Sequence, residues 1–205
     1  MGGSLSCRRP LSVSPQSYPT LQLHVFGLAG SGKHSIVRFL KYGVPVLDAK
    51  RDDVEVDMQW ITHRKVRMLL WVSEHTAQKE VANATDVARA LVCVVDGSDP
   101  DKLAAARDYL FTQLQETTGT PNLLILLNKC DKHSFVFLEE AHDALNLDQI
   151  RDRHVRIYAC SAATGEGIRE ALDWLCSKFH LQNGIYVSRK GEQNSYQPHI
   201  FADTM

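Results

Sequence analysis

A glycine-rich turn between an apolar stretch and an amphipathic stretch is the feature that most constrains this chain. Residues 21–26 are mostly apolar and predict a strand, and residues 27–33 are Gly-Leu-Ala-Gly-Ser-Gly-Lys. Glycines let the backbone turn sharply and bring its N–H groups within hydrogen-bonding distance of an anion. The helix expected next, with Ile36, Phe39 and Leu40 on one face, points the positive end of its dipole at the same place. The stretch 21–43 therefore predicts a phosphate-binding loop.

The loop follows the signature of such loops at all but one position. The signature is G-x-x-x-x-G-K followed by Ser or Thr, whose hydroxyl holds magnesium, and His34 stands in the place of that hydroxyl. An ordinary glycine-rich turn is the alternative, but the order of strand, glycines, lysine and helix favours the phosphate site. The predicted nucleotide contacts in this stretch are Gly27, Gly30, Ser31, Gly32, Lys33, His34 and Ser35.

Length and composition predict a single globular domain without a membrane-spanning segment. The chain has 205 residues, 44% of them hydrophobic, which suffices for one domain with a core on both sides of a sheet. Its 23 basic and 24 acidic residues are nearly balanced, which argues against a nucleic-acid partner. The five cysteines form no C-x-x-C pair and are expected to be reduced thiols in a cytoplasmic protein. The longest apolar runs are far too short to span a bilayer, and the N-terminus lacks the apolar core of a secretory signal.

Residues 1–20 are predicted to form a flexible arm, because their prolines forbid a continuous helix. The first residues fit Met-Gly-x-x-x-Ser, the N-myristoylation pattern, with Gly2 as the acceptor. One acyl chain holds a protein on a membrane only marginally, and Cys7, Arg8 and Arg9 would supply the second signal that stable anchoring needs. A Gly-Gly-Ser expression scar is the alternative reading of the same residues. The arm thus predicts a peripheral attachment to a membrane surface.

From residue 54 onward, predicted strands alternate with helices. Residues 54–62 alternate strictly between apolar and polar and are followed, after a polar turn, by an apolar set at 66, 68 and 70, which predicts an antiparallel hairpin. Apolar strands at 90–95, 123–127 and 155–159 each precede a polar loop and an amphipathic helix. We therefore predict an α/β fold with a six-stranded, mostly parallel sheet and helices on both faces. Ligands of such sheets bind at the carboxyl ends of the strands.

Two further segments complete the predicted organisation. Residues 74–88 are compatible with a helix, and residues 181–205 have no period and much polarity, which predicts a tail. The folded domain is expected to span residues 21–180, between the arm and this tail.

Two polar loops at predicted strand ends carry a pattern for recognising a base. The base loop, residues 128–131, is Asn-Lys-Cys-Asp, and Ser161-Ala162 follow the next strand. The Asp131 carboxylate can accept two hydrogen bonds, from the ring N–H and the exocyclic amine of guanine, and adenine offers no such pair. The Lys129 stem can pack over the base plane while its ammonium stays solvated. Asn128, Lys129, Asp131, Ser161 and Ala162 are therefore the predicted base contacts, and a plain polar turn is the alternative.

With these motifs in this order, the chain resembles the Ras superfamily, and within it the branch of ADP-ribosylation factor (Arf) and Arf-like proteins. The resemblance covers residues 20–180. Its motifs are GLAGSGK at 27–33, CVVDGSD at 93–99, LLILLNKCD at 123–131 and TGEGIREALDWL at 164–175. It implies a P-loop small-GTPase-like fold, GTP or GDP as the bound nucleotide, and a protein effector or complex as partner.

The chain departs from this branch where the branch holds magnesium and positions water. His34 replaces the P-loop hydroxyl, and imidazole is a poor ligand for a hard ion that prefers oxygen. The range 37–60 contains no Ser or Thr that could serve as the first-switch threonine, and Asp53 stands at the matching place. Residues 71–76 are Trp-Val-Ser-Glu-His-Thr, where the branch has the second-switch motif W-D-x-G-G-Q. We therefore expect no catalytic and no metal-ligating residue, a doubtful role for magnesium, and very weak or absent hydrolysis. His34, His63 and His75 lie in separate elements, without the spacing of a transition-metal site.

Four functions compete on these residues. The first is a membrane-tethered, Arf-like guanine-nucleotide-binding adaptor in trafficking or signalling that does not turn over GTP. The second is a conventional GTP-hydrolysing switch with unusual residues, and the third is a structural subunit without nucleotide. A P-loop nucleotide kinase is the fourth, but the base loop and the absence of an arginine-rich lid argue against it.

Overall fold

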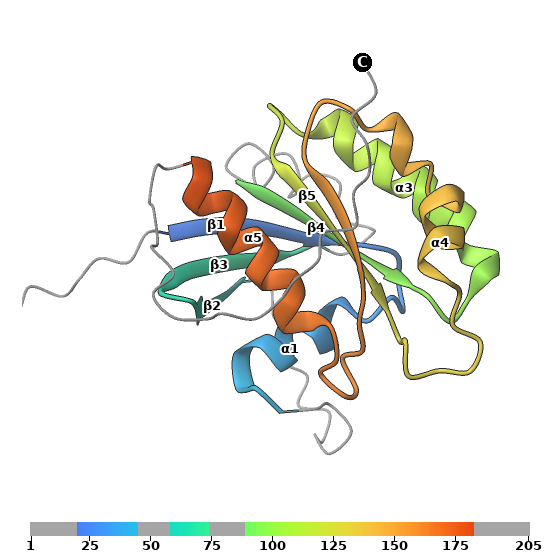
Figure 1. The fold of residues 1–205 in the computed structure, drawn as a ribbon, viewed down its shortest axis with the longest axis horizontal. Coiled ribbons are helices and arrows are strands. Elements are labelled where there is room, and N and C mark those ends of the chain that lie inside the picture. The colour runs from blue at the N-terminus through green and yellow to red at the C-terminus, as the bar shows by residue number, and fades with distance from the viewer. Residues whose placement is uncertain (1–19, 45–57, 74–88, 183–205) are drawn as a thin grey trace, which may run out of the picture.

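A six-stranded sheet forms the centre of the computed structural model, which describes residues 20–44, 58–73 and 89–182 (Figure 1). Within these residues the strand order is β2-β3-β1-β4-β5-β6, and β2 and β3 form the antiparallel pair while the other neighbours are parallel. The strands are β1 (Thr20–Phe26), β2 (Met58–His63), β3 (Val66–Val72), β4 (Ala90–Asp96), β5 (Asn122–Asn128) and β6 (Val155–Ala159). The predicted α/β class and the six-stranded, mostly parallel sheet are confirmed.

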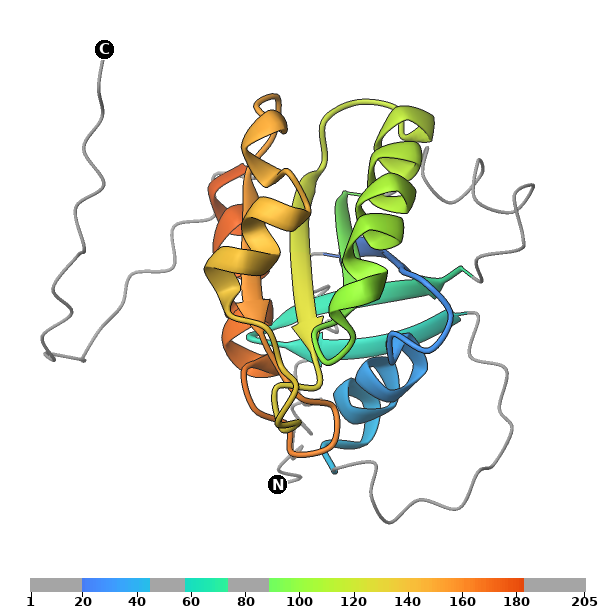
Figure 2. The same ribbon diagram turned by 90° about the vertical axis from the view of Figure 1, so that its right-hand side faces the viewer.

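Helices cover both faces of this sheet, as the two views in Figures 1 and 2 show. Among the described residues, α1 (Lys33–Tyr42) and α5 (Ile168–Gln182) pack on one face, and α3 (Leu103–Glu116) and α4 (Leu138–Ala144) pack on the other. Short 3₁₀ turns, η2 (Pro100–Lys102) and η3 (Leu147–Gln149), precede α3 and follow α4. Parallel strands need such crossover helices, and covering both faces is what makes their continuous apolar runs stable.

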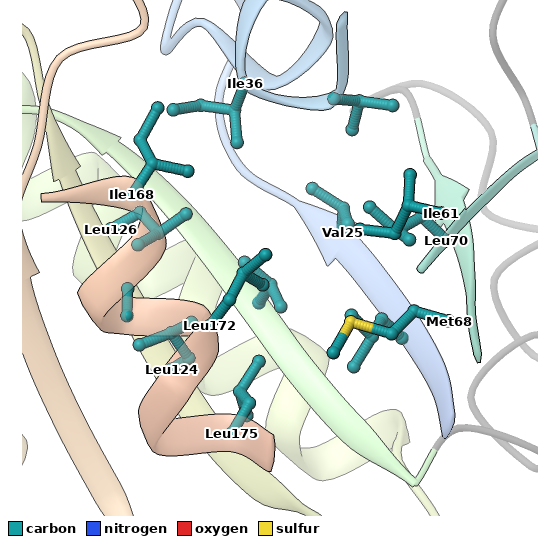
Figure 3. Packing of buried hydrophobic residues seen from close by; sticks show 14 of the residues in the cluster. Val25, Ile36, Ile61, Met68, Leu70, Leu124, Leu126, Ile168, Leu172 and Leu175 are labelled. Carbon is teal, nitrogen blue, oxygen red and sulfur yellow. The ribbon is translucent and has the colours of Figure 1, made fainter. Parts of the chain in front are cut away.

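The alternation of side chains along each strand produces two separate cores. Leu23 and Val25 of β1 face α1 and α5, whereas Phe26 joins the cluster under α3. Figure 3 shows the first cluster, in which Ile36 of α1 and Leu172 of α5 meet the sheet. β4 and β5 are buried along nearly their whole length. Each fully buried Leu, Ile or Val contributes about 1.5–3 kcal/mol relative to an exposed one, so the two clusters supply most of the driving force for this fold.

The β2–β3 hairpin confirms the strand pairing that the sequence predicts. Its two-residue turn has Arg64 at φ 46° and Lys65 at φ 62°, the left-handed pair that suits the twist of such hairpins. Positions 54–57 of the predicted strand and the helix predicted at 74–88 lie outside the described residues. Thr20 belongs to β1 because it pairs with Arg67, so the sheet begins one residue before the predicted domain boundary.

The carboxyl ends of β1, β4, β5 and β6 meet at one edge of the sheet because these four strands are parallel neighbours. β1 lies between β3 and β4, so the chain changes its direction of winding after β1, and ligands of open α/β sheets bind at such a switch point. The candidate site lies at this edge. Among the helices of the described residues, none is long and apolar enough to cross a bilayer.

Candidate functional site

The phosphate loop, residues 27–33, follows β1 in a conformation in which a side chain would collide with neighbouring atoms at two points. Gly27 has a φ of 152° and Gly32 one of 95°. A Cβ atom on Gly27 would lie 2.1 Å from the Val94 carbonyl oxygen, and one on Gly32 would lie 2.2 Å from Nδ2 of Asn128. At Gly30, by contrast, a Cβ atom would meet nothing within 4 Å. The loop therefore packs against β4 and the base loop at its ends and stays open at its centre.

Lys33 begins α1 and is nearly buried, with 4% of its surface exposed. Its ammonium donates hydrogen bonds to the carbonyl oxygens of Gly27, at 2.9 Å, and Leu28, at 3.1 Å. A buried ammonium is costly unless it is hydrogen-bonded, so these carbonyls fix its position. The amino-terminal end of the α1 dipole adds positive potential at the same place. The loop thus concentrates positive charge where an anion would bind.

The other predicted phosphate contacts differ in exposure. Ser31 is buried, and its Oγ finds no hydrogen-bond partner among the described residues. His34 is exposed on the first turn of α1, and Ser35 is half-buried beside it. Leaving a buried hydroxyl unpaired costs about 1–3 kcal/mol. The Ser31 hydroxyl is therefore a polar group that a ligand in the loop could satisfy.

Asn128, at the end of β5, joins all three predicted loops. Its Nδ2 donates to the Ser31 carbonyl oxygen at 2.9 Å, and its Oδ1 accepts from the Ala162 backbone N–H at 3.0 Å. The side chain is buried, so both bonds form away from water. One amide therefore holds the phosphate loop, the base loop and the Ser-Ala loop (residues 160–163) in a fixed arrangement.

Asp131 is held by the Ser-Ala loop. The Ser161 hydroxyl donates to Asp131 Oδ1 at 2.6 Å, and the same Oγ accepts from the backbone N–H groups of Ala163 and Thr164. The hydrogen bond from Ser161 lowers the pKa of the Asp131 carboxyl, so it is ionised and acts as an acceptor at neutral pH. The Cys130 N–H also donates to the Cys160 carbonyl oxygen at 3.0 Å. The predicted acceptor for a base is thus preorganised.

Lys129 has a partner that the sequence analysis missed. Its Nζ lies 2.5 Å from Oδ2 of Asp96, the last residue of β4. Burial alone would raise the pKa of Asp96, but hydrogen bonds from Lys129 and Ser98 outweigh it and lower that pKa. Asp96 is in register with Asn128 across the sheet. The position of Asp96 at the end of a predicted strand is the sequence feature that could have indicated a contact with the base loop.

Two of the predicted magnesium positions, His34 and Val72, lie within the described residues. Val72, in the place of the second-switch aspartate, is a buried apolar residue of β3. Asp53, His75, Gly2 and Cys7 lie outside the described residues.

His63 is hydrogen-bonded to Asp173 of α5 at 2.6 Å. Within the described ranges no group of three or more His, Cys, Asp or Glu side chains could hold a metal ion. His34 and Val72 do not fit magnesium, which prefers oxygen ligands.

The described cysteines are Cys93, Cys130, Cys160 and Cys176, all with free thiols. Burial raises the pKa of the Cys93 and Cys176 thiols to about 12, and it also raises the pKa of the Cys160 thiol. Since the thiolate is the nucleophile, these three buried groups are chemically inert.

Taken together, the site offers a glycine-lined cradle with a fixed ammonium and, on the neighbouring loops, an ionised carboxylate held at a set position. The cradle suits a phosphate group, because backbone N–H groups and the α1 amino terminus favour an anion. The carboxylate suits a base that presents two donors. The geometry therefore fits a guanine nucleotide that extends from the phosphate loop to the base loop.

Comparison with known proteins agrees with this arrangement. Residues 11–179 match the model of the ADP-ribosylation factor family. ADP-ribosylation factor-like protein 1 of Drosophila melanogaster is 29% identical over 85% of this chain and 96% of its own length. The protein of the same name from Caenorhabditis elegans is 30% identical over 87% of this chain and 97% of its own length. That of Saccharomyces cerevisiae is 31% identical over 76% and 85%. The chain therefore belongs to the ADP-ribosylation factor family of the Ras superfamily.

Proposed function

We propose that this protein is an Arf-like guanine-nucleotide-binding adaptor that binds GTP or GDP, does not turn over GTP, and is tethered to a membrane. The observation that carries the nucleotide part is the Asn128 side chain, whose two hydrogen bonds join the phosphate loop to the Ser-Ala loop. Both halves of a nucleotide site are thereby fixed relative to each other. Family membership supports guanine nucleotide as the ligand.

The phosphate half would bind through the loop backbone, Lys33 and Ser35. The open centre of the loop at Gly30 and the Ser31 hydroxyl, which has no hydrogen-bond partner among the described residues, support a ligand there. The base half would bind through Asp131, which Ser161 holds as an ionised acceptor. Guanine is the base that satisfies both acceptor positions of that carboxylate.

Hydrolysis is proposed to be absent because charge stabilisation at the phosphates is incomplete. Phosphoryl transfer relies on a metal ion and on a positioned water, and neither His34 nor Val72 supplies an oxygen ligand. The chain also has no glutamine at the water-positioning place in 71–76. Nucleotide would then be held by protein groups alone, largely independent of magnesium.

The adaptor part of the proposal rests on an exposed apolar edge and on the N-terminal arm. Met58 and Trp60 of the edge strand β2 are 53% and 50% exposed, and the Arg67 guanidinium lies 4.6 Å from the Trp60 ring centre. Exposed aromatic and methionine side chains are enriched at protein interfaces, which supports a protein effector or complex partner. Gly2 and Cys7 would carry the lipids that keep the protein peripherally on a membrane in the cytoplasm.

A structural subunit without nucleotide is the second candidate, and one observation favours it. The ammonium groups of Lys33 and Lys129 both contact protein oxygens, so the charged groups of the site are stabilised by the protein itself. Such a site can keep its shape without a ligand.

The test is to purify the full-length protein gently and to chromatograph the nucleotide released on denaturation. We expect close to one guanine nucleotide per protein chain. Added GTP should displace this nucleotide, and added ATP should not. A protein that carries no nucleotide and takes up neither GTP nor GDP would favour the structural subunit. Equal uptake of ATP and GTP would remove the argument from Asp131.

A further inference from the structure

The carboxylate of Asp96 contacts the base loop, and each of its two oxygens has a different partner residue. Oδ2 lies 2.5 Å from Nζ of Lys129, and Oδ1 accepts from the Ser98 backbone N–H at 2.9 Å and from the Ser98 hydroxyl at 2.7 Å. The Asp96 side chain is 13% exposed and that of Lys129 is 32% exposed. A pair this well enclosed is screened far less by water than a surface ion pair.

Backbone hydrogen bonds join the two loops that carry this pair. The Gly97 N–H donates to the Asn128 carbonyl oxygen at 2.8 Å, and the Val136 N–H donates to the Gly97 carbonyl oxygen at 2.9 Å. Lys129 itself has a φ of 72°, in the left-handed region that a lysine adopts only when its surroundings impose it. Backbone and side chain of Lys129 are therefore both fixed by the loop that follows β4.

We propose that Asp96 is a positioning residue for nucleotide binding, which holds the Lys129 ammonium so that the lysine stem forms the platform against which the guanine ring packs. The proposal rests on the proposed nucleotide-binding function and adds a residue to it. Asp96 does not touch the base, because its oxygens are engaged by Lys129 and Ser98. Its effect is to fix the rotamer of a long side chain that would otherwise have to be ordered each time nucleotide binds.

Asp96→Asn removes the charge and keeps the shape, and two other variants complete the design. Lys129→Met keeps an apolar stem and removes the ammonium. Asp99→Asn is the matched control, because Asp99 lies in the same loop and pairs with Lys102 at the same 2.5 Å, but on an exposed surface. Fluorescent GDP is titrated into each full-length variant and into Asp96→Asn/Lys129→Met, and xanthosine diphosphate competition and the melting temperature are measured alongside.

Asp96→Asn and Lys129→Met are each expected to weaken fluorescent GDP about tenfold, which corresponds to ~1.4 kcal/mol, and the double variant no more than either alone. Asp99→Asn should stay within about twofold. The preference for GDP over xanthosine diphosphate should not change in Asp96→Asn, because Asp131 and Ser161 set it. A general distortion of the base loop would reduce that preference together with the affinity.

Two results would overturn the proposal while leaving nucleotide binding intact. One is an unchanged GDP affinity in Asp96→Asn. The other is a loss of affinity from Asp96→Asn that is as large in Lys129→Met as in the native protein, because Asp96 would then act on nucleotide binding without Lys129. If Asp96→Asn fails to fold, Lys129→Met decides, because Lys129 is the less buried partner of the pair, and an unchanged GDP affinity in Lys129→Met overturns the proposal. If the unmodified protein binds no guanine nucleotide, the proposed function falls and this proposal falls with it.

Discussion

His24, in the middle of β1, should make the stability of this protein depend on pH in the range between the ordinary and the lowered pKa of its imidazole. The imidazole is fully buried, its Nε2 lies 2.9 Å from the Ser73 hydroxyl, and its Nδ1 has no partner within the described part of the chain. Burial lowers the pKa of His24 from its ordinary value of 6.5 to about 4. The native state therefore keeps this side chain neutral.

The sign and size of the pH effect on the free energy of unfolding follow from the difference between the pKa of His24 in the unfolded and the folded chain. Between pH 6.5 and pH 4 the unfolded chain binds a proton at this residue and the folded chain does not, so the free energy of unfolding falls as the pH falls. Linkage over these two pKa values gives a loss of about 2 kcal/mol between pH 7.5 and pH 5, and a limit of about 3 kcal/mol at still lower pH. This is a large part of the stability of a typical domain.

The assay is urea unfolding of the native protein and of His24→Gln at pH 7.5, 6.5 and 5. Glutamine keeps a group that can bond to Ser73 and does not titrate, so the native protein should lose about 2 kcal/mol more than the variant between the two extremes. His133→Gln, which removes an exposed imidazole, controls for the change of residue type. If native protein and His24→Gln lose stability in parallel, the argument from the buried neutral imidazole is wrong.

Three further predictions concern the site and the arm. Lys33→Ala should weaken GDP at least about a hundredfold, because it removes a buried charge beside the phosphates; fluorescent GDP binding measures it, and a small loss would contradict the assigned role. Asp131→Asn should weaken guanine and favour xanthine nucleotides, whose extra carbonyl needs a donor; competition between the two diphosphates checks this, and an unchanged preference would refute it. Gly2→Ala should release the protein from the membrane fraction of cells, since myristoylation requires that glycine; an unchanged distribution would end the lipid proposal.

The architecture could be predicted because its signals are local. The strict alternation around Ile61 gave the hairpin, and the runs at β4 and β5 are apolar without interruption because both faces of those strands are covered. The glycines of the phosphate loop were identified from spacing alone. Their φ values and close contacts give the physical reason, since a side chain at Gly32 would collide with Asn128.

Contacts between distant loops could not be predicted in the same way. Sequence pattern places Asn128 and Asp96 at strand ends but does not tell which groups they bond, because strand order and register decide it. The pairing of Lys129 with Asp96 depends on β4 and β5 being neighbours, and the bridge from Asn128 to Ser31 depends in addition on β1 lying next to β4. The packing of the Phe39 ring against the backbone at Gly165 is a third example, since a Cβ there would lie 2.5 Å from the ring.

Retention of GTP in the presence of a chelator is the most informative measurement of the proposed function. The full-length protein is loaded with GTP, divided between excess magnesium and excess EDTA, incubated for several hours, and the bound nucleotide is chromatographed. We predict equal amounts of nucleotide in both samples, all of it GTP, because the proposed site holds nucleotide through protein groups and neither His34 nor Val72 supplies an oxygen ligand for a metal. Loss of nucleotide in EDTA, or conversion of GTP to GDP with magnesium, would contradict it.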